Sequence, residues 1–171
     1  MKIAITGHTK GIGKALFDLL STDYECLGFS RSTGYNISAP GKILQKSTHA
    51  DIFINNAYHE TDQELLFELL LKNWKEDTSK TIVNINSRAH YSSVGASTYS
   101  DSKISLWESS RKYLTNRKCR IINVSPGYVD TDMVAHQRGK VNMITAKQCA
   151  EYIKWAIEQP IEIYELALWK L

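Results

Sequence analysis

The hydrophobic and polar positions of the chain alternate between two patterns from one end to the other. Short apolar runs, typical of strands buried on both faces, are followed by stretches whose apolar residues recur three and four positions apart, typical of amphipathic helices. The runs that predict strands are Lys2–Thr6, Tyr24–Ser30, Asp51–Asn55, Thr81–Ser87, Arg120–Ser125 and Ile163–Leu168, with room for a very short further strand around Tyr35–Ile37. The helical patterns are Lys14–Leu20, Glu60–Trp74, Thr98–Leu114 and Thr145–Glu158. Repeated strand-then-helix units predict an α/β fold, a parallel sheet with helices on both faces.

Two helix starts and one loop complete this picture. Thr98 with Asp101 three positions later resembles a capping box, and Thr145 is a plausible N-cap for the last helix. The segment Tyr128–Ile144 is polar and irregular. With 171 residues the chain has the length of a single domain, so we expect one domain over 1–171 with a small loop lobe at 128–144.

Composition and charge argue against several classes of protein without identifying one. The formal charge of +3 is spread along the chain, which does not indicate a nucleic-acid surface. Cys26, Cys119 and Cys149 form no C-x-x-C motif, which favours reduced thiols in a cytoplasmic protein. The first residues enter a strand directly, so no signal peptide is expected. The apolar run Leu65–Leu71 is too short to cross a membrane, so no membrane association is expected.

Three glycines stand between the first strand and the first helix. Gly7, Gly11 and Gly13 are spaced G-x-x-x-G-x-G. Glycines in this context permit a tight turn and a close approach of a pyrophosphate to the amide groups at the helix N-terminus. The pattern favours dinucleotide binding over the alternative, an ordinary strand-to-helix turn.

The most informative stretch for chemistry is residues 82–103, in which Tyr99 precedes Lys103 by four positions. Positions i and i+4 share one face of a helix, so the phenol and the ammonium can point into one pocket. A cation about 4 Å from a phenol would lower its pKa of ~10 by roughly 3. Tyr99 could then exchange protons near neutral pH, and Ser87 could hold the oxygen on which it acts. The alternative is a chance pair on a solvated helix face.

Taken in order along the chain, these motifs resemble those of the short-chain dehydrogenase/reductase family, and the resemblance extends over essentially the whole chain. The matching segments are TGHTKGIG at the glycine turn, NNAY at Asn55–Tyr58, Ser87 after IVNIN, YSDSK at Tyr99–Lys103 and PGYVDT at Pro126–Thr131. The chain is shorter than is usual for this family. The resemblance implies a Rossmann-like, doubly wound parallel sheet.

The resemblance also implies roles for individual residues. Tyr99 would be the general acid/base, Lys103 would hold the ribose hydroxyls and tune that tyrosine, and Ser87 would orient the substrate oxygen. Thr131 would contact the nicotinamide carboxamide. The residues expected to bind the cofactor are Gly7, Thr9, Lys10, Gly11, Ile12, Gly13, Arg31, Asn36, Ile37, Asn56, Ala57, Tyr99, Lys103, Pro126, Gly127, Val129 and Thr131. No metal site is expected.

Charge at the end of the second strand favours NADP(H) over NAD(H). An NAD-preferring protein would be expected to carry an acid there, which binds the ribose 2′-hydroxyl. Here the strand ends at Arg31, and Lys10 adds a second cation near the same position. Two cations that converge on a 2′-phosphate favour the phosphorylated cofactor.

Several departures from the family pattern matter. The asparagine that many members carry between Asn56 and Ser87 has no obvious equivalent, and Gln63 or Asp62 takes its place. Tyr58 replaces the last glycine of NNAG, close to the expected path of the nicotinamide ribose. The five histidines, His8, His49, His59, His90 and His136, have no metal spacing, and we interpret them as turn or surface residues. His90 and Tyr91 could instead line a substrate pocket.

These observations predict an NADP(H)-dependent oxidoreductase of the carbonyl reductase or alcohol dehydrogenase type, acting on a small carbonyl or alcohol. The alternative is a non-catalytic NADP(H)-binding regulator or scaffold with a vestigial site. We also expect a homodimer or homotetramer that pairs through the helices at Glu60–Trp74 and after Tyr99, with Trp107 and Leu114 on the pairing face.

Overall fold

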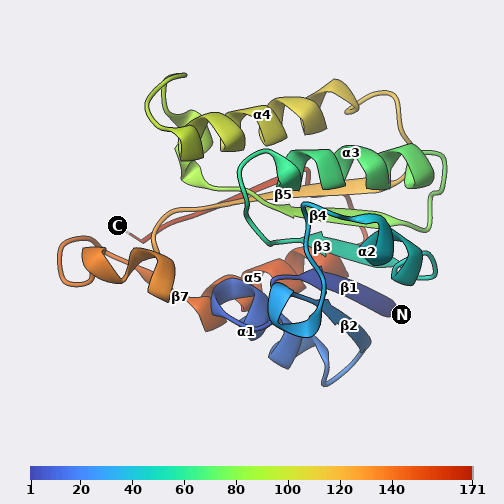
Figure 1. The fold of residues 1–171 in the computed structure, drawn as a ribbon, viewed down its shortest axis with the longest axis horizontal. Helices are drawn as coiled ribbons and strands as arrows, with labels where there is room; N and C mark the ends of the chain where they lie inside the picture. Colours follow the sequence, from blue (N-terminus) through green and yellow to red (C-terminus); the bar gives the residue numbers. More distant parts are fainter. Residues whose placement is uncertain (171) are drawn as a thin grey trace.

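A computed structural model describes residues 1–170, and its centre is one parallel sheet (Figure 1). Six strands lie in the order β2-β1-β3-β4-β5-β8, and every neighbouring pair is parallel. The strands are β1 (Lys2–Thr6), β2 (Glu25–Phe29), β3 (Ile52–Asn55), β4 (Thr81–Ile85), β5 (Arg120–Pro126) and β8 (Glu165–Leu168). This is the doubly wound, Rossmann-like architecture that the sequence predicts.

Helices cover both faces of the sheet (Figure 1). On one face α1 (Gly11–Leu20) and α5 (Ala146–Glu158) pack on a core that includes Ile3, Ile5 and Val124. On the other, α2 (Gly41–Lys46), α3 (Asp62–Trp74) and α4 (Thr98–Lys112) pack on a core around Phe53 and Ile121. Alternate strand residues enter opposite cores because successive side chains of a strand point to opposite faces.

The remaining short elements lie at the carboxyl edge of the sheet. They are the 3₁₀ turns η1 (Arg31–Thr33), η2 (Arg88–Tyr91) and η3 (Asp132–Gln137), with the strand pair β6 (Val129–Asp130) and β7 (Ile144–Thr145). The expected loop at 128–144 is therefore partly ordered by η3 and by the β6–β7 pairing. No helix among residues 1–170 is long and apolar enough to cross a membrane.

Two local predictions are wrong. Residues 35–37 form no strand, and Ile37 is instead buried beside Phe29 in the core under α2. The helix after Ser97 is capped by Ser97 itself, whose hydroxyl accepts from the amide of Ser100, and not by Thr98. The side chain of Asp101 accepts from Gly95 N and so is engaged outside the helix. By contrast, Thr145 caps α5, as predicted, in a reciprocal box with Gln148.

A row of buried asparagines crosses the middle of the sheet. Asn55, Asn84 and Asn123 are register partners on β3, β4 and β5, and all three are fully buried. Asn55 Nδ2 donates to Asn84 Oδ1 at 3.1 Å, and Asn84 Nδ2 donates to Asn123 Oδ1 at 3.3 Å. Because an unpaired buried amide is costly, this row favours the observed register over a shifted one.

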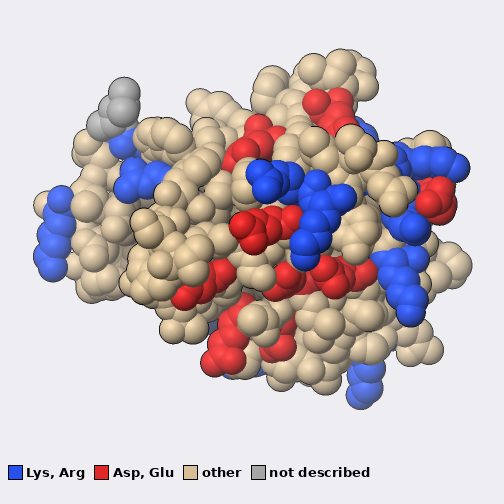
Figure 2. All heavy atoms as spheres, turned by 90° about the horizontal axis from the view of Figure 1, so that it is seen from above, with Lys and Arg blue, Asp and Glu red and all other residues tan. Residues whose placement is uncertain are grey.

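The outward side of α3 and α4 is strongly charged, as Figure 2 shows from above. Its exposed residues include Glu68, Lys72, Glu108 and Arg111. Trp107, expected on a pairing face, is half-buried and its ring stacks on His90. Leu114 is 45% exposed just after α4. The apolar stripe of α3 faces the sheet. Self-association through the outward side of α3 and α4 therefore stays a prediction, and it would depend largely on polar contacts.

Gly13 is required by close packing in the glycine turn. A Cβ at this position would lie 2.2 Å from Gly7 O, a backbone atom that cannot move aside without distorting the turn. We expect Gly13→Ala to lower the free energy of unfolding by about 1–3 kcal/mol, the usual cost of overpacking. Urea denaturation followed by circular dichroism measures this change.

Gly41 provides the matched control, because a Cβ there meets nothing within 4 Å. Gly41→Ala, at the start of α2, should leave stability unchanged or raise it by about 0.4–1 kcal/mol. Similar losses in the two variants would contradict the packing explanation.

Candidate active site

One large cavity opens at the carboxyl ends of the central strands. Its volume is about 1000 Å³, and its walls come from the turn after β1, the ends of β2 to β5 and the segment after β5. This edge of a parallel sheet is where ligands bind in open α/β folds. All of the predicted site residues line the cavity except Gly13, which lies behind the wall and packs on Gly7.

The glycine turn leaves the N-terminus of α1 open toward the cavity. Gly7 and Gly11 have positive φ values of 71° and 54°, which residues with a Cβ rarely adopt. Within the described chain, the first turn of α1 carries no acidic residue, and Lys10 provides no side-chain cap. The free amide groups and the positive end of the helix therefore suit an anionic group such as a pyrophosphate.

His8 explains why the second strand carries a glycine. Its ring lies 5.0 Å from the Phe17 ring, and a Cβ on Gly28 would come within 2.4 Å of it. His8 is a half-exposed turn residue, as the sequence predicts, and its ring packs on Phe17 and against Gly28.

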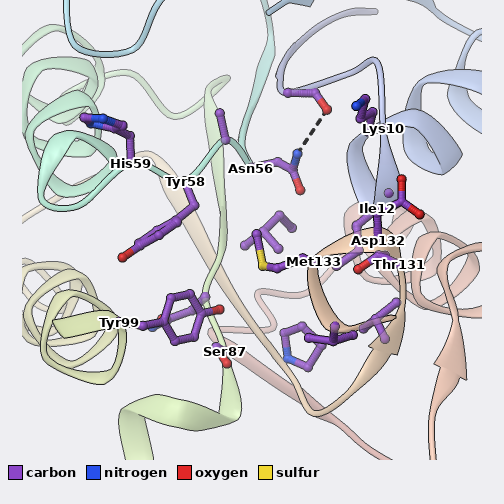
Figure 3. A pocket seen from close by; sticks show the side chains of 18 of the residues that line it. Lys10, Ile12, Asn56, Tyr58, His59, Ser87, Tyr99, Thr131, Asp132 and Met133 are labelled. Atoms are coloured by element: carbon purple, nitrogen blue, oxygen red, sulfur yellow. Dashed lines mark hydrogen bonds between the residues drawn. The ribbon is translucent and has the colours of Figure 1, made fainter. Parts of the chain in front are cut away.

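Asn56 joins the end of β3 to the glycine turn. Its Nδ2 donates to Thr6 O at 2.9 Å. It also donates to Gly7 O at 3.5 Å, the contact drawn as a dashed line in Figure 3. The Thr6 hydroxyl in turn accepts from the backbone amides of Asn56 and Ala57. These contacts hold two walls of the cavity in a fixed relation.

Two exposed cations border the cavity on the side of β1 and β2. Lys10 and Arg31 both line it, and neither forms an ion pair with any residue in the described part of the chain. Their charge is therefore available to a ligand. Asn36 and Ile37 line the same part of the cavity.

Lys103 is buried and held by a glutamine. Its Nζ donates to Gln63 Oε1 at 2.6 Å and to Ile85 O at 3.2 Å, and it is only 2% exposed. Gln63 Nε2 donates to Asn55 O and Ile85 O at 2.7 and 2.9 Å, which directs Oε1 at the ammonium. Of the two residues proposed for the place of the family asparagine, Gln63 reaches Lys103, whereas Asp62 bonds to Ser38 and His59.

The electrostatics of Tyr99 and Lys103 differ from the sequence-based argument. Burial raises the pKa of Tyr99, the Ser87 hydroxyl lowers it through a hydrogen bond, and Tyr58 raises it. Lys103 Nζ lies over the Tyr99 ring, 5.5 Å from its centre, and its hydrogen bonds within residues 1–170 go to Gln63 and Ile85. Burial lowers the pKa of Lys103 to about 7, so the lysine carries less than a full charge at neutral pH. The predicted depression of the Tyr99 pKa by Lys103 is therefore absent in this structure.

Tyr58 lines the cavity next to Tyr99 and Lys103. Its ring meets the Tyr99 ring edge-on at a centroid distance of 4.9 Å, and Lys103 Nζ lies 5.2 Å from its centre. Figure 3 shows the two tyrosines next to each other on one side of the cavity. This side chain narrows the cavity where the resemblance would have the nicotinamide ribose pass.

The segment after β5 forms the outer wall. A Cβ on Gly11 would lie 3.2 Å from Thr131 Cγ2, so the two sides of the cavity approach each other here. Met133 extends from this segment into the cavity (Figure 3). His90 and Tyr91 do not line it, although Arg88, Ala89 and Ser92 from the same turn do.

One residue that sequence reasoning missed is Asn86. It lines the cavity directly before Ser87, is 3% exposed, and neither of its side-chain polar atoms has a hydrogen-bond partner among residues 1–170. A buried amide without partners is unfavourable by about 1–3 kcal/mol per group, so a ligand with both donors and acceptors fits here. Its position next to Ser87 in the sequence was the available signal.

The chain is similar to known proteins both in part of its sequence and in its fold. The short chain dehydrogenase family model matches residues 64–142. No curated protein matches the chain in sequence. The matched segment contains Ser87, Tyr99 and Lys103, so in this part of the sequence the chain is similar to the short chain dehydrogenase family.

Solved structures share the fold at low sequence identity. The 3-alpha-hydroxysteroid dehydrogenase of Pseudomonas sp. B-0831, complexed with NADH, is 19% identical with a TM-score of 0.81, over 98% of this chain and 95% of that one. A short chain dehydrogenase of Burkholderia cenocepacia J2315 in complex with NADP is 18% identical with a TM-score of 0.75, over 99% and 88%. The alcohol dehydrogenase of Thermococcus sibiricus, complexed with 5-hydroxy-NADP, is 16% identical with a TM-score of 0.75, over 98% and 95%.

Burial of Lys103 makes a specific prediction for stability. Its pKa falls from 10.5 in the unfolded chain to about 7 in the folded one, so folding is opposed by the loss of a proton or by burial of the charge. This cost is full below about pH 7, decreases as the pH rises, and vanishes near 10.5, where the lysine is neutral in both states. It reaches several kcal/mol at about 1.4 kcal/mol per pKa unit.

Lys103→Met should therefore gain stability relative to the wild type at low pH and lose that gain steadily between pH 7 and 10. Urea unfolding at several pH values measures the difference in unfolding free energy between the variant and the wild type. The variant also loses the hydrogen bonds of Lys103, but the change of this difference with pH does not depend on them. Lys72→Met, at an exposed position on α3, is the control and should show no such slope. A flat difference for Lys103→Met would contradict the shifted pKa.

Proposed function

We propose that the protein is an NADP(H)-dependent oxidoreductase that interconverts a small carbonyl compound and its alcohol. The observation that carries this proposal is the convergence of Ser87, Tyr99 and Lys103 on the cavity that the open N-terminus of α1 also faces. The bound cofactor would supply or accept the hydride. The protein groups would bind it, orient the substrate and move the accompanying proton.

The glycine turn and the two cations would bind different parts of the cofactor. The amides of the first turn of α1 would hold the pyrophosphate, and Lys10 and Arg31 would face the 2′-phosphate. Asn56 and Ala57 would pack beside the nicotinamide half, with Thr131 and the unpaired amide of Asn86 as its polar contacts. The unpaired cations and the buried unpaired amide support this assignment, since both need a polar partner.

Ser87 and Tyr99 would act directly on the substrate oxygen. In the direction of reduction, the Tyr99 hydroxyl donates its proton to the oxygen while Ser87 donates a hydrogen bond to it. The phenolate that remains is favoured by a protonated Lys103, and the pKa of about 7 lets this lysine gain a proton near neutral pH. Gln63 keeps Lys103 directed at the site. The segment 128–144 would cover a small substrate, in accord with its short length.

Arg31 tests the choice of cofactor. A charge-assisted hydrogen bond to a phosphate is worth about 1.5–3 kcal/mol. Arg31→Asp should therefore weaken NADPH binding at least about tenfold and leave NADH binding unchanged or improved. Fluorescence titration with both cofactors measures this effect. The control is Lys42→Asp, an equal charge change at an exposed residue of α2 outside the cavity. An equal loss of both cofactors in Arg31→Asp would refute the assignment.

The second candidate is a non-catalytic NADP(H)-binding regulator or scaffold. The Tyr58 ring beside Tyr99 and Lys103, which narrows the cavity, favours it. The presence of Ser87, Tyr99 and Lys103 in one cavity opposes it. Self-association and a cytoplasmic location remain parts of the proposal, the latter supported by the three cysteines, all of which are free.

Tyr99→Phe separates the two candidates. The change retains the ring but removes the hydroxyl that passes a proton, and general acid/base catalysis is typically worth 10²–10⁴-fold. For an enzyme, NADPH-dependent reduction across a carbonyl panel should fall by about that factor, while NADPH affinity changes by less than about fivefold. Tyr113→Phe, outside the cavity, is the control. The second candidate, a non-catalytic regulator or scaffold, would be supported if the wild type binds NADPH but reduces no carbonyl and Tyr99→Phe behaves in the same way.

A further inference from the structure

A buried histidine holds the backbone of Ser87 from behind the cavity. Ser87 O accepts from His90 N at 3.1 Å and lies 2.7 Å from His90 Nδ1. His90 lies in the turn η2, as predicted, but it is only 7% exposed and so is not a surface residue. Its ring stacks on Trp107 of α4 at 5.2 Å with an angle of 17° between the planes. The imidazole is thus fixed in orientation by the carbonyl and by the indole together.

The other side of this imidazole faces an acid from the far end of the chain. His90 Nε2 lies 3.4 Å from Oε1 of Glu165, the first residue of β8, and among residues 1–170 it has no hydrogen-bond partner. The same oxygen accepts from Tyr91 OH at 2.7 Å and from Ser125 Oγ at 3.4 Å. Glu165 and its donors therefore join η2 to β5 and β8, on the side of Ser87 opposite the cavity.

The proton positions in this network follow from its chemistry. A carbonyl oxygen can only accept, so the 2.7 Å contact with Ser87 O requires a proton on Nδ1. In the neutral tautomer, Nε2 would then present a lone pair to an ionised carboxylate, and two acceptors would face each other in a buried place. A second imidazole proton removes this conflict, because the imidazolium carries a proton on each nitrogen and its positive charge attracts the carboxylate.

We propose that His90, as an imidazolium paired with Glu165, is a positioning residue that sets the place of Ser87 for the reaction. This inference rests on the proposed function only in so far as Ser87 orients a substrate oxygen. Ser87 is the N-cap of η2, and its hydroxyl accepts from Ala89 N while its carbonyl accepts from His90. A change in the His90 ring therefore moves the same short turn that holds the Ser87 hydroxyl near Tyr99.

The charged and titratable groups around His90 are few. From β8 it faces Glu165, from its own turn Tyr91, and from β5 the neutral Ser125. From α4 it meets Trp107, over which the guanidinium of Arg111 also lies, at 4.9 Å from the ring centre. Burial and the bond to Glu165 raise the pKa of Tyr91 to about 12, so Tyr91 stays neutral where histidines titrate. Glu165 is thus the anion that balances the imidazolium.

Nuclear magnetic resonance tests the protonation state without any assay of turnover. In protein labelled with ¹⁵N-histidine, the His90 signals are assigned as those missing from His90→Ala. We expect both ring nitrogens to be protonated at pH 7, and the carbonyl ¹³C shift of Ser87 to change in step with the loss of the second proton at higher pH. The proposal would be overturned if His90 is neutral at pH 7, or if the carbonyl ¹³C shift of Ser87 does not change as His90 loses its second proton.

Kinetics test the positioning role. His90→Ala should lower NADPH-dependent turnover at least about tenfold with NADPH affinity nearly unchanged, since small misplacements of a reacting group are costly. Glu165→Gln lets the new amide donate to a neutral imidazole, so turnover should stay within about threefold of wild type. It should also lose the decline at alkaline pH that departure of the second proton causes in wild type.

Glu162→Gln is the matched control for the carboxylate. Glu162 lies three residues before Glu165, pairs with Arg117 and accepts from Ile121 N, without contact to His90. If it lowers turnover or alters the pH profile as Glu165→Gln does, the effect is general support of β8 and the proposal fails. If wild type shows no turnover with any carbonyl, the proposed function fails while the ¹³C and ¹⁵N titrations still decide the His90–Ser87 link.

Discussion

The hydrogen bond from Lys103 to Gln63 is the contact on which the arrangement of the site depends. It joins α4 to α3, and through Gln63 Nε2 it also fixes the ends of β3 and β4, whose carbonyls accept from the same amide. The Lys103 ammonium and both polar atoms of the Gln63 side chain have partners, and both residues are buried. Buried polar groups in such a state are well ordered, because any displacement leaves one of them unpaired.

The partner of the buried Lys103 amine is a neutral amide, and this affects the pKa of the lysine. A carboxylate in place of Gln63 would favour the ammonium strongly, whereas an amide oxygen leaves desolvation dominant, and the pKa falls to about 7. The lysine can thus gain or lose a proton at physiological pH. Tyr99, in turn, keeps a raised pKa until a charge is present beside it. If Tyr99 is the general acid/base proposed above, its activation depends on the protonation of Lys103.

The parallel sheet explains why so many candidate residues share one cavity. In a doubly wound sheet, the carboxyl ends of all strands reach the same edge, so segments far apart in sequence meet there. The same geometry brings Glu165 behind Ser87, although 78 positions separate them. Sharing one cavity also means that its residues compete for space. The side chain of Tyr58, after the end of β3, occupies space that a glycine would leave open.

Much of the fold could be predicted from the sequence, for a physical reason. Strands buried on both faces must be continuously apolar, and helices on a sheet must carry one apolar stripe, so the order of elements follows from local pattern. The glycine turn, Ser87, Tyr99 and Lys103 were likewise predicted, because each has a spacing tied to its element. Residues 35–37 were misassigned because a buried Ile37 satisfies the same apolar pattern without a strand.

What only the tertiary structure decided is which distant groups meet and in which charge state. The sequence left Gln63 and Asp62 as equal candidates, since both lie in the first turn of α3, and only the direction of their side chains separates them. It could not show that His90 is buried between Ser87 and Glu165, because that contact depends on the placement of β8 beside β5. Nor could it give the pKa directions, which follow from burial. Local spacing therefore determined the elements and the candidate chemistry, whereas desolvation and long-range contacts determined how the candidate residues are arranged and charged.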